Sequence, residues 1–112
     1  MKTEIKTLVG KIKKDYIKFA TANGEKELTG YHAEQVHNFE RNTTITDGRK
    51  YIKIVRDNCV WGFVVKENFK HLIKGDILKA AGFNAPTLNR ARGNIFALDN
   101  LKVKWMGANY LK

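Results

Sequence analysis

The chain has 112 residues, of which 43% are hydrophobic and 29% charged, and it carries a formal net charge of +10. This composition is typical of one globular domain, and because Cys59 is the single cysteine, the chain can form neither an internal disulfide nor a cysteine-based zinc site. The longest apolar run, around residues 60–65, is far shorter than the roughly 20 residues of a membrane span. We therefore expect a soluble, intracellular protein with no membrane partner.

The positive charge is concentrated in the second half of the chain. Residues 1–48 carry eight Lys/Arg and seven Asp/Glu, whereas residues 49–112 carry thirteen Lys/Arg and four Asp/Glu. A surface that only keeps a protein soluble usually mixes both signs. The excess therefore indicates an anionic partner, with a plain solvated face as the alternative.

Two helices are expected at the start of the chain. Apolar residues recur at three- and four-residue steps from position 4 to position 23, with lysines between them, which predicts an amphipathic helix. Thr3 is its expected N-cap, and the pair at 23–24, Asn-Gly, is its expected end. Thr29 is expected to cap a second helix that runs to about residue 42. His32 and His37 are five residues apart and would lie on different faces of that helix, so we expect no shared metal ion.

After residue 48 the sequence pattern becomes typical of β-strands. Strands at about 50–56 and 60–66, joined by a turn at 57–58, predict a hairpin in which Trp61, Phe63 and Val65 share one face. A third strand is expected at 77–80, with a closely packed corner at 80–83. Pro86 and Gly93 suggest the start and the end of a short helix, with a positive φ at Gly93. A further strand pair is expected at 95–98 and 101–105.

Helices followed by strands predict an α+β fold, in which the N-terminal helices pack on a small, mainly antiparallel, curved sheet. We expect residues 1–112 to form a single domain, with a helical part at 1–45 and a basic β-rich part at 46–112. The strand hairpin should lie at the centre of the sheet.

The sequence shows little that would support catalysis. Cys59 is expected at a hairpin turn as a small, half-buried thiol without a nearby histidine, and His71 stands alone between lysines. Paired carboxylates and glycine-rich phosphate loops are also absent from the sequence pattern. The sequence therefore predicts a binding protein that is no enzyme and that uses no metal and no cofactor.

Basic and aromatic residues together form the strongest candidate site. Rings can stack on bases while ammonium and guanidinium groups neutralise phosphates, a combination typical of proteins that bind single-stranded nucleic acid. Core packing is the competing interpretation for Trp61 and Phe63, and less so for Trp105. For Arg92 the alternative is a structural role, in which it donates hydrogen bonds to carbonyls at the 80–82 corner. The candidate nucleic-acid-binding residues are Lys53, Arg56, Lys66, Lys79, Arg90, Arg92, Lys102, Lys104 and Trp105. The lysines at 11, 13 and 14 are expected to matter less, because their half of the chain is nearly neutral.

Residues 74–86, KGDILKAAGFNAP, and residues 91–96, ARGNIF, resemble a segment of a family of small, functionally uncharacterised proteins of tailed bacteriophages. Weaker similarity extends over residues 46–112, as far as Tyr110 and Leu111, with Phe83 where the family more often has Trp. Residues 1–45 share only helical and polar character. The resemblance implies a viral origin and a place in the host cytoplasm or the virion, and it transfers no catalytic residue.

These observations lead to several functional hypotheses. The first is a phage-encoded accessory protein that binds nucleic acid, preferably single-stranded, through phosphate contacts and with little sequence readout. The second is an inhibitor of a host or anti-phage defence protein that has an acidic surface. A minor virion component and a nucleotide-binding protein are further alternatives.

Overall fold

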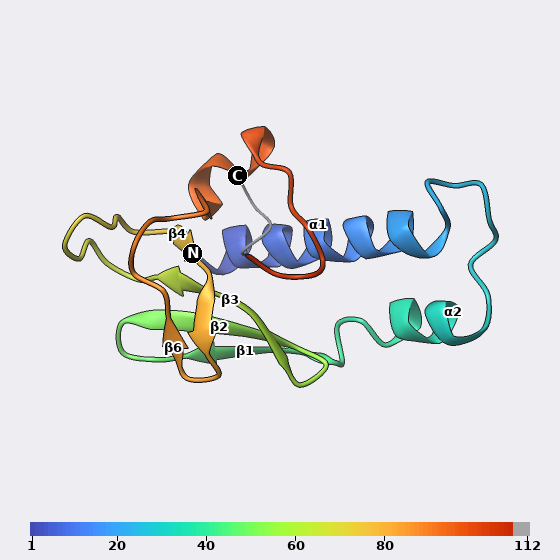
Figure 1. The fold of residues 1–112 in the computed structure, drawn as a ribbon, viewed down its shortest axis with the longest axis horizontal. Coiled ribbons are helices and arrows are strands. Elements are labelled where there is room, and N and C mark those ends of the chain that lie inside the picture. Colours follow the sequence, from blue (N-terminus) through green and yellow to red (C-terminus); the bar gives the residue numbers. More distant parts are fainter. Residues whose placement is uncertain (109–112) are drawn as a thin grey trace.

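Residues 1–108, which a computed structural model describes, contain two α-helices, a five-stranded sheet and a two-stranded sheet (Figure 1). Residues 109–112, where the phage resemblance ends, lie outside this range. The large sheet has the strand order β1-β2-β3-β4-β7, and all neighbours are antiparallel. The predicted α+β class is therefore confirmed. In chain order the elements are α1 (Lys2–Ala20), α2 (Gly30–His37), β1 (Thr43–Asp47), β2 (Tyr51–Arg56), β3 (Cys59–Val65), β4 (Asp76–Leu78), β5 (Ala80–Gly82), β6 (Ala85–Pro86), β7 (Gly93–Asn94) and the 3-10 helix η1 (Ile95–Asn100).

Helix α1 packs its apolar stripe on one face of the sheet (Figure 1). The buried residues of α1 are Ile5, Leu8, Ile12 and Tyr16, the three- and four-residue spacing that the sequence predicts. They meet the side chains of β2, β3 and β4 that point to the same side, among them Ile54, Val64 and Ile77. The central hairpin and its covering helix are thus where the sequence places them.

The ends of α1 differ from the prediction by a few residues. The helix begins at Lys2, so Thr3 lies inside it and does not serve as the N-cap. It ends at Ala20 with Thr21 as its C-cap, because Ala22, Asn23 and Gly24 then have φ values of 50°, 61° and 91°, which no right-handed helix contains. The Asn-Gly pair at 23–24 does lie where the chain leaves the helical conformation, but the helix itself ends three residues before Asn23.

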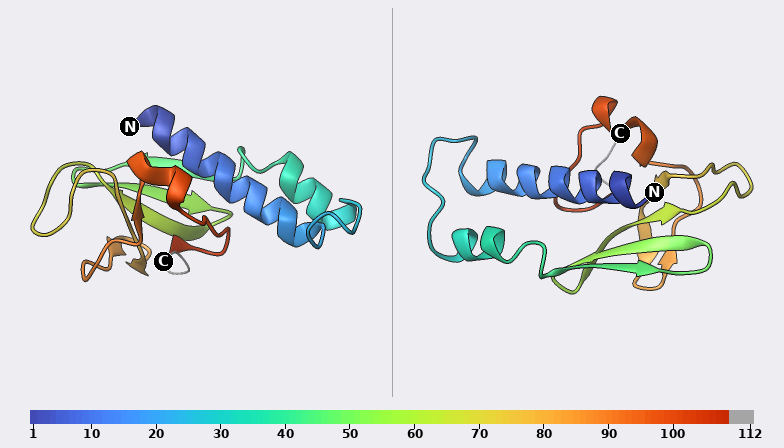
Figure 2. Two further views of the ribbon diagram at one scale, coloured as in Figure 1. Left: turned by 90° about the horizontal axis from the view of Figure 1, so that it is seen from above. Right: turned by 180° about the vertical axis from the view of Figure 1, so that it is seen from behind.

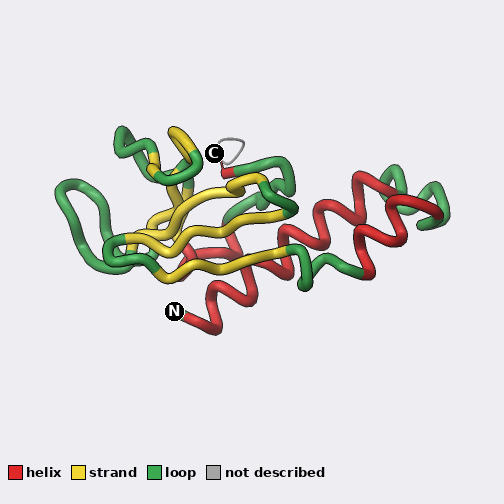
Figure 3. Tube along the Cα trace, turned by 90° about the horizontal axis from the view of Figure 1, so that it is seen from below, coloured by secondary structure: helices red, strands yellow, loops and turns green. Residues whose placement is uncertain are grey.

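Helix α2 is shorter than predicted and lies beside the far end of α1, beyond the sheet (Figure 2, Figure 3). Thr29 occupies the N-cap position, as expected, but its side chain makes no capping hydrogen bond. The helix stops at His37, and the chain turns so that Phe39 is buried. The predicted extension to residue 42 is therefore wrong. Strand β1 was not predicted at all, and it crosses the expected boundary between the helical and β-rich parts.

A β-bulge in the central hairpin changes the faces of β3. The turn residues Asp57 and Asn58 have φ values of 51° and 67°, as a tight hairpin turn requires. Ile54 pairs with Gly62 but Val55 pairs with Val60, so Trp61 is the extra residue. Trp61 therefore joins the core beneath α1, whereas Phe63 and Val65 belong to a second cluster on the other face. The prediction that these three residues share a face is wrong.

The segment after β4 departs most from the sequence analysis. The expected strand at 77–80 is divided between β4 and β5, which belong to different sheets. Residues 86–93 form no helix, because the amide of Thr87 donates to the carbonyl of Lys79 and that of Arg92 to the carbonyl of Ile77, both at 2.7 Å. The backbone bonds of this segment are thus made with the neighbouring strand and not within a helix.

The corner at residues 80–83 is open and not closely packed. Ala81 and Gly82 are exposed, and the ring of Phe83 is 55% exposed, so it is no core plug. Gly93 has the predicted positive φ, 156°, but it lies in β7 and ends no helix. A Cβ at Gly93 would approach the Leu101 side chain to 2.7 Å, which gives the glycine a packing reason as well.

The predicted final strand pair is replaced by η1 and an extended segment at 101–104. Asn94 caps η1 by accepting a hydrogen bond from the amide of Phe96 at 2.8 Å. Residues 101–104 alternate between inward and outward side chains as a strand does, yet within the described chain their backbone joins no sheet. This segment lies over α1 and positions the site described next.

Candidate functional site

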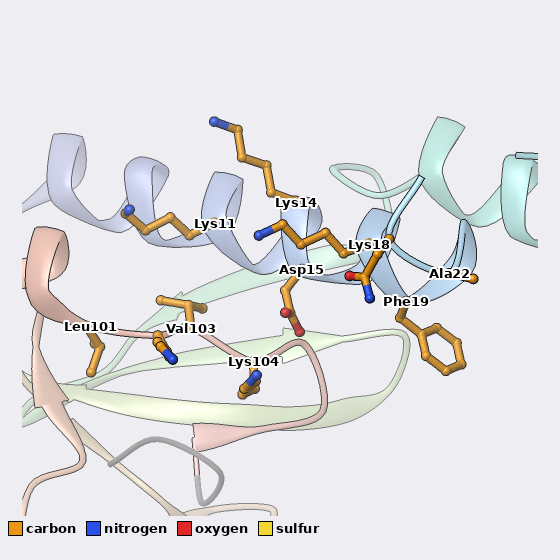
Figure 4. Close-up of a pocket in the computed structure, with 11 residues that line it drawn as sticks. Lys11, Lys14, Asp15, Lys18, Phe19, Ala22, Leu101, Val103 and Lys104 are labelled. Atoms are coloured by element: carbon orange, nitrogen blue, oxygen red, sulfur yellow. The ribbon is translucent and has the colours of Figure 1, made fainter. Parts of the chain in front are cut away.

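An open groove of about 760 Å³ lies between α1 and the segment 101–104 (Figure 4). Five lysines line this groove, three from the helix and two from the segment: Lys11, Lys14, Lys18, Lys102 and Lys104. Asp15 is the one acidic residue of its lining. We call this feature the lysine groove.

The local sequence explains why both walls present lysines. Lys11, Lys14 and Lys18 follow each other at steps of three and four, so they form one stripe of α1 beside the apolar stripe. On the other wall, Val103 is 8% exposed and packs in the core, which turns its neighbours Lys102 and Lys104 outward to solvent. The lysine stripe of the helix thus lies across the groove from the two outward lysines of the extended segment.

Two hydrogen bonds hold the second wall in place. The indole Nε1 of Trp61 donates to the carbonyl of Lys104 at 2.7 Å, and the backbone amide of Trp105 donates to Oδ2 of Asp15 at 2.9 Å. Both bonds use the main chain of the segment, so the lysine side chains remain available. The Asp15 carboxylate is already engaged in this anchoring bond.

The lysines of the groove carry no neutralising partner within residues 1–108, where no ion pair includes any of the five. Lys13 on the same helix behaves differently, because its Nζ lies 3.0 Å from Oε1 of Glu40 and lowers the pKa of that carboxyl through a hydrogen bond. Close like charges raise the local potential and attract anions. The groove therefore carries an excess of positive charge, with five lysines against the single carboxylate of Asp15.

An aromatic residue lies at one end of the groove. Phe19 belongs to the lining and is 57% exposed, and Figure 4 shows its ring at that end. Its ring centroid lies 5.0 Å from that of Trp105, which in turn meets Tyr16 edge to face at 5.1 Å. Trp105 is half-buried, so it supports the exposed ring more than it presents its own face to solvent.

Arg56 lies behind this aromatic group and not on an open surface. Its guanidinium carbon is 4.8 Å from the ring of Tyr16, 4.9 Å from Phe39 and 5.4 Å from Trp105, all within cation-π range. Its Nε is buried and finds no partner among the described residues. Burial raises the pKa of the Tyr16 hydroxyl, and the Arg56 cation opposes that shift.

Two other predicted site residues are held by contacts within the protein. Lys53 lies on the face of the sheet that is turned away from α1. There its Nζ donates to the Phe83 carbonyl at 3.3 Å and to Oδ1 of Asn84 at 3.2 Å. Lys66 forms an ion pair with Asp47 and donates to the Gly48 carbonyl. Neither residue lies in the lysine groove.

The remaining candidates are distributed over the surface. Arg90 is exposed and Lys79 half-exposed, and neither lines the groove. Arg92 is partly buried, and its buried Nε has no hydrogen-bond partner in the described part of the chain. This atom therefore does not make the structural hydrogen bonds expected for Arg92. Cys59 is exposed and not half-buried as expected. Of the nine predicted residues, Lys102 and Lys104 line the groove, and Trp105 lies beside Phe19 at its end with Arg56 behind it.

The sequence analysis missed the helix wall and the exposed ring, that is Lys11, Lys14, Lys18 and Phe19. The lysine spacing of three and four residues is a readable signal. A count of charge over halves of the chain hides this signal, because the acids Glu25, Glu27 and Glu34, which lie outside the groove lining, cancel the helix lysines.

The chain matches no protein-family model, no curated protein and no solved structure. Among the described residues, no helix is both long and apolar enough to cross a membrane, and no three His, Cys, Asp or Glu side chains gather as a metal site would require.

Proposed function

We propose that this protein binds nucleic acid, with a preference for single strands, through the lysine groove. The observation that carries the proposal is the gathering of five lysines, from α1 and from residues 102–104, around one open groove. The single acid of the lining, Asp15, accepts a bond from the Trp105 amide. A phosphate chain offers the repeated negative charge that such a groove complements.

The chemistry of the groove favours contacts with phosphates over reading of bases. Lysine ammonium groups act as mobile point charges with three donors each, and they recognise phosphate without fixing a base edge. From the sequence alone, this binding is expected on the basic β-rich half. The lysine groove lies between the two parts of the chain, and it combines Lys102 and Lys104 of that prediction with the helix lysines.

The proposal is tested by titrating fluorescent single-stranded DNA and RNA oligonucleotides with the protein at several salt concentrations. We expect a log-log salt slope of about −3, since each neutralised phosphate of a single strand contributes about −0.7. The double variant Lys102→Glu/Lys104→Glu should lower affinity on the order of tenfold or more and should flatten the slope. Lys14→Glu/Lys18→Glu should do the same, because these residues form the opposite wall.

A matched control carries the same change of charge outside the groove. Lys6 and Lys26 are exposed and line no part of it. Lys6→Glu/Lys26→Glu should therefore reduce binding far less than either groove variant. Equal losses in all three variants would mean that overall charge and not the groove attracts the ligand, and no binding at about 50 mM salt would exclude nucleic acid.

An acidic protein surface would also complement the groove, and an inhibitor of a host or defence protein remains the alternative function. The phage origin and the host-cytoplasmic or virion setting depend on the sequence resemblance alone and stay predictions.

A further inference from the structure

We infer that Phe19 is a base-stacking platform at the end of the lysine groove, so that the groove selects strands with accessible bases over duplexes and over phosphate chains without bases. This inference rests on the proposed function and adds the class of ligand. It concerns a residue that the sequence analysis did not consider as part of a site.

Phe19 is unusual in being both exposed and held in place. The residue is 57% exposed, yet its ring has three aromatic neighbours: Trp105 at 5.0 Å, His32 at 5.9 Å and Tyr16 at 6.1 Å between centroids. His32 is itself fixed by a 2.9 Å hydrogen bond between its Nδ1 and the Tyr16 hydroxyl. A ring that is already ordered loses little conformational entropy when a ligand stacks on it.

The position of the ring fits the charge of the groove. Lys18 directly precedes Phe19, and Lys14 lies one helical turn before Lys18 on the same wall (Figure 4). A strand whose phosphates lie along the lysines would bring a base to the end of the groove, where the exposed ring is found. Alternating charge and aromatic surface is the combination that single-stranded binding proteins use.

Stacking on Phe19 requires a base whose face is free. Bases inside a duplex are already stacked on both sides, and polyphosphate has no base to offer. A groove that acted through lysines alone would bind single strands, duplexes and polyphosphate according to their charge. The aromatic end therefore predicts a selectivity that the lysines cannot supply.

The experiment compares three probes: a thymidine oligonucleotide, an abasic oligonucleotide of equal length and inorganic polyphosphate. In the wild-type protein we expect the thymidine oligonucleotide to bind about tenfold or more tightly than the abasic one, as one stacked base would provide. Phe19→Leu should remove this difference and leave the affinity for polyphosphate within about twofold. Phe19→Trp should restore the preference.

Phe83→Leu is the matched control. Phe83 is 55% exposed and has the Lys53 ammonium 4.2 Å from its ring centroid, but it does not line the groove. This variant should bind every probe as the wild type does. Thermal melting of Phe19→Leu and Phe83→Leu would show that both remain folded.

The possible failures are distinguishable. Equal binding of the thymidine and abasic probes, or a Phe19→Leu variant that keeps the preference, would overturn the platform while leaving the lysine groove intact. A loss of preference in Phe83→Leu and not in Phe19→Leu would move stacking to the other face of the sheet and would also overturn it. Failure of the wild type to bind any of the probes would overturn the proposed function itself.

Discussion

Trp61 shows how the position of a single residue decides its role. Strict alternation along β3 would place it with Phe63 and Val65, on the face opposite α1. The bulge opposite Ile54 and Val55 turns it to the helix side, where it is 3% exposed and donates to the Lys104 carbonyl. The core and the groove wall are thus joined through one indole, a link that no sequence pattern contains because a bulge depends on strand pairing.

Gly93 gives a prediction at the same scale. Its φ of 156° and the 2.7 Å approach of a Cβ to Leu101 both oppose a side chain. Gly93→Val should therefore lower the free energy of unfolding by about 1 kcal/mol or more, measured by urea denaturation. Gly82→Ala is the control, because a Cβ there meets no atom within 4 Å and should leave stability nearly unchanged. Equal stability of the two variants would contradict this explanation.

At the scale of elements, α1 carries two stripes with different functions. One is apolar and packs on the sheet, and the other is the lysine stripe of the groove. The sequence predicts the first stripe, the central hairpin and the α+β class, because periodicity and turn residues are local signals. It mispredicts residues 84–105, whose backbone bonds go to distant partners, as when Arg92 bonds to Ile77. The groove as a whole cannot be predicted from the sequence either: the lysine stripe of α1 is a local signal, but its pairing with residues 101–104 arises only in the folded chain.

A substitution in the apolar stripe tests the packing of α1. Ile12 is 1% exposed in the core, so Ile12→Asp places an unpaired charge there at a cost of several kcal/mol, comparable with the total stability of a small domain. We expect the variant to be largely unfolded at 25 °C by circular dichroism. Lys14→Asp, at an exposed position of the same helix, should melt within a few degrees of the wild type. If Ile12→Asp did so too, α1 would not be part of the core.

At the scale of the whole molecule, the basic half of the chain is not a separate structural unit. Residues 49–112 hold thirteen of the 21 Lys/Arg residues, yet the larger apolar cluster combines α1 and Phe39 with β2, β3 and β4. The lysine groove also takes one wall from each end of the chain. Both the core and the proposed binding site therefore require the two parts together.

The last prediction follows from this dependence on both parts. A fragment of residues 46–112 keeps most of the basic residues but exposes the sheet face that Ile5, Leu8 and Ile12 cover in the full chain. Exposing that much apolar surface costs more free energy than the whole free energy of unfolding of a small domain. We expect the fragment to show poorly dispersed amide resonances and no cooperative thermal transition, and to lose the preference for the thymidine over the abasic oligonucleotide, whereas the full chain should unfold in one step. A fragment that folds cooperatively and keeps that preference would show that the basic β-rich part is sufficient and that α1 contributes neither core nor site.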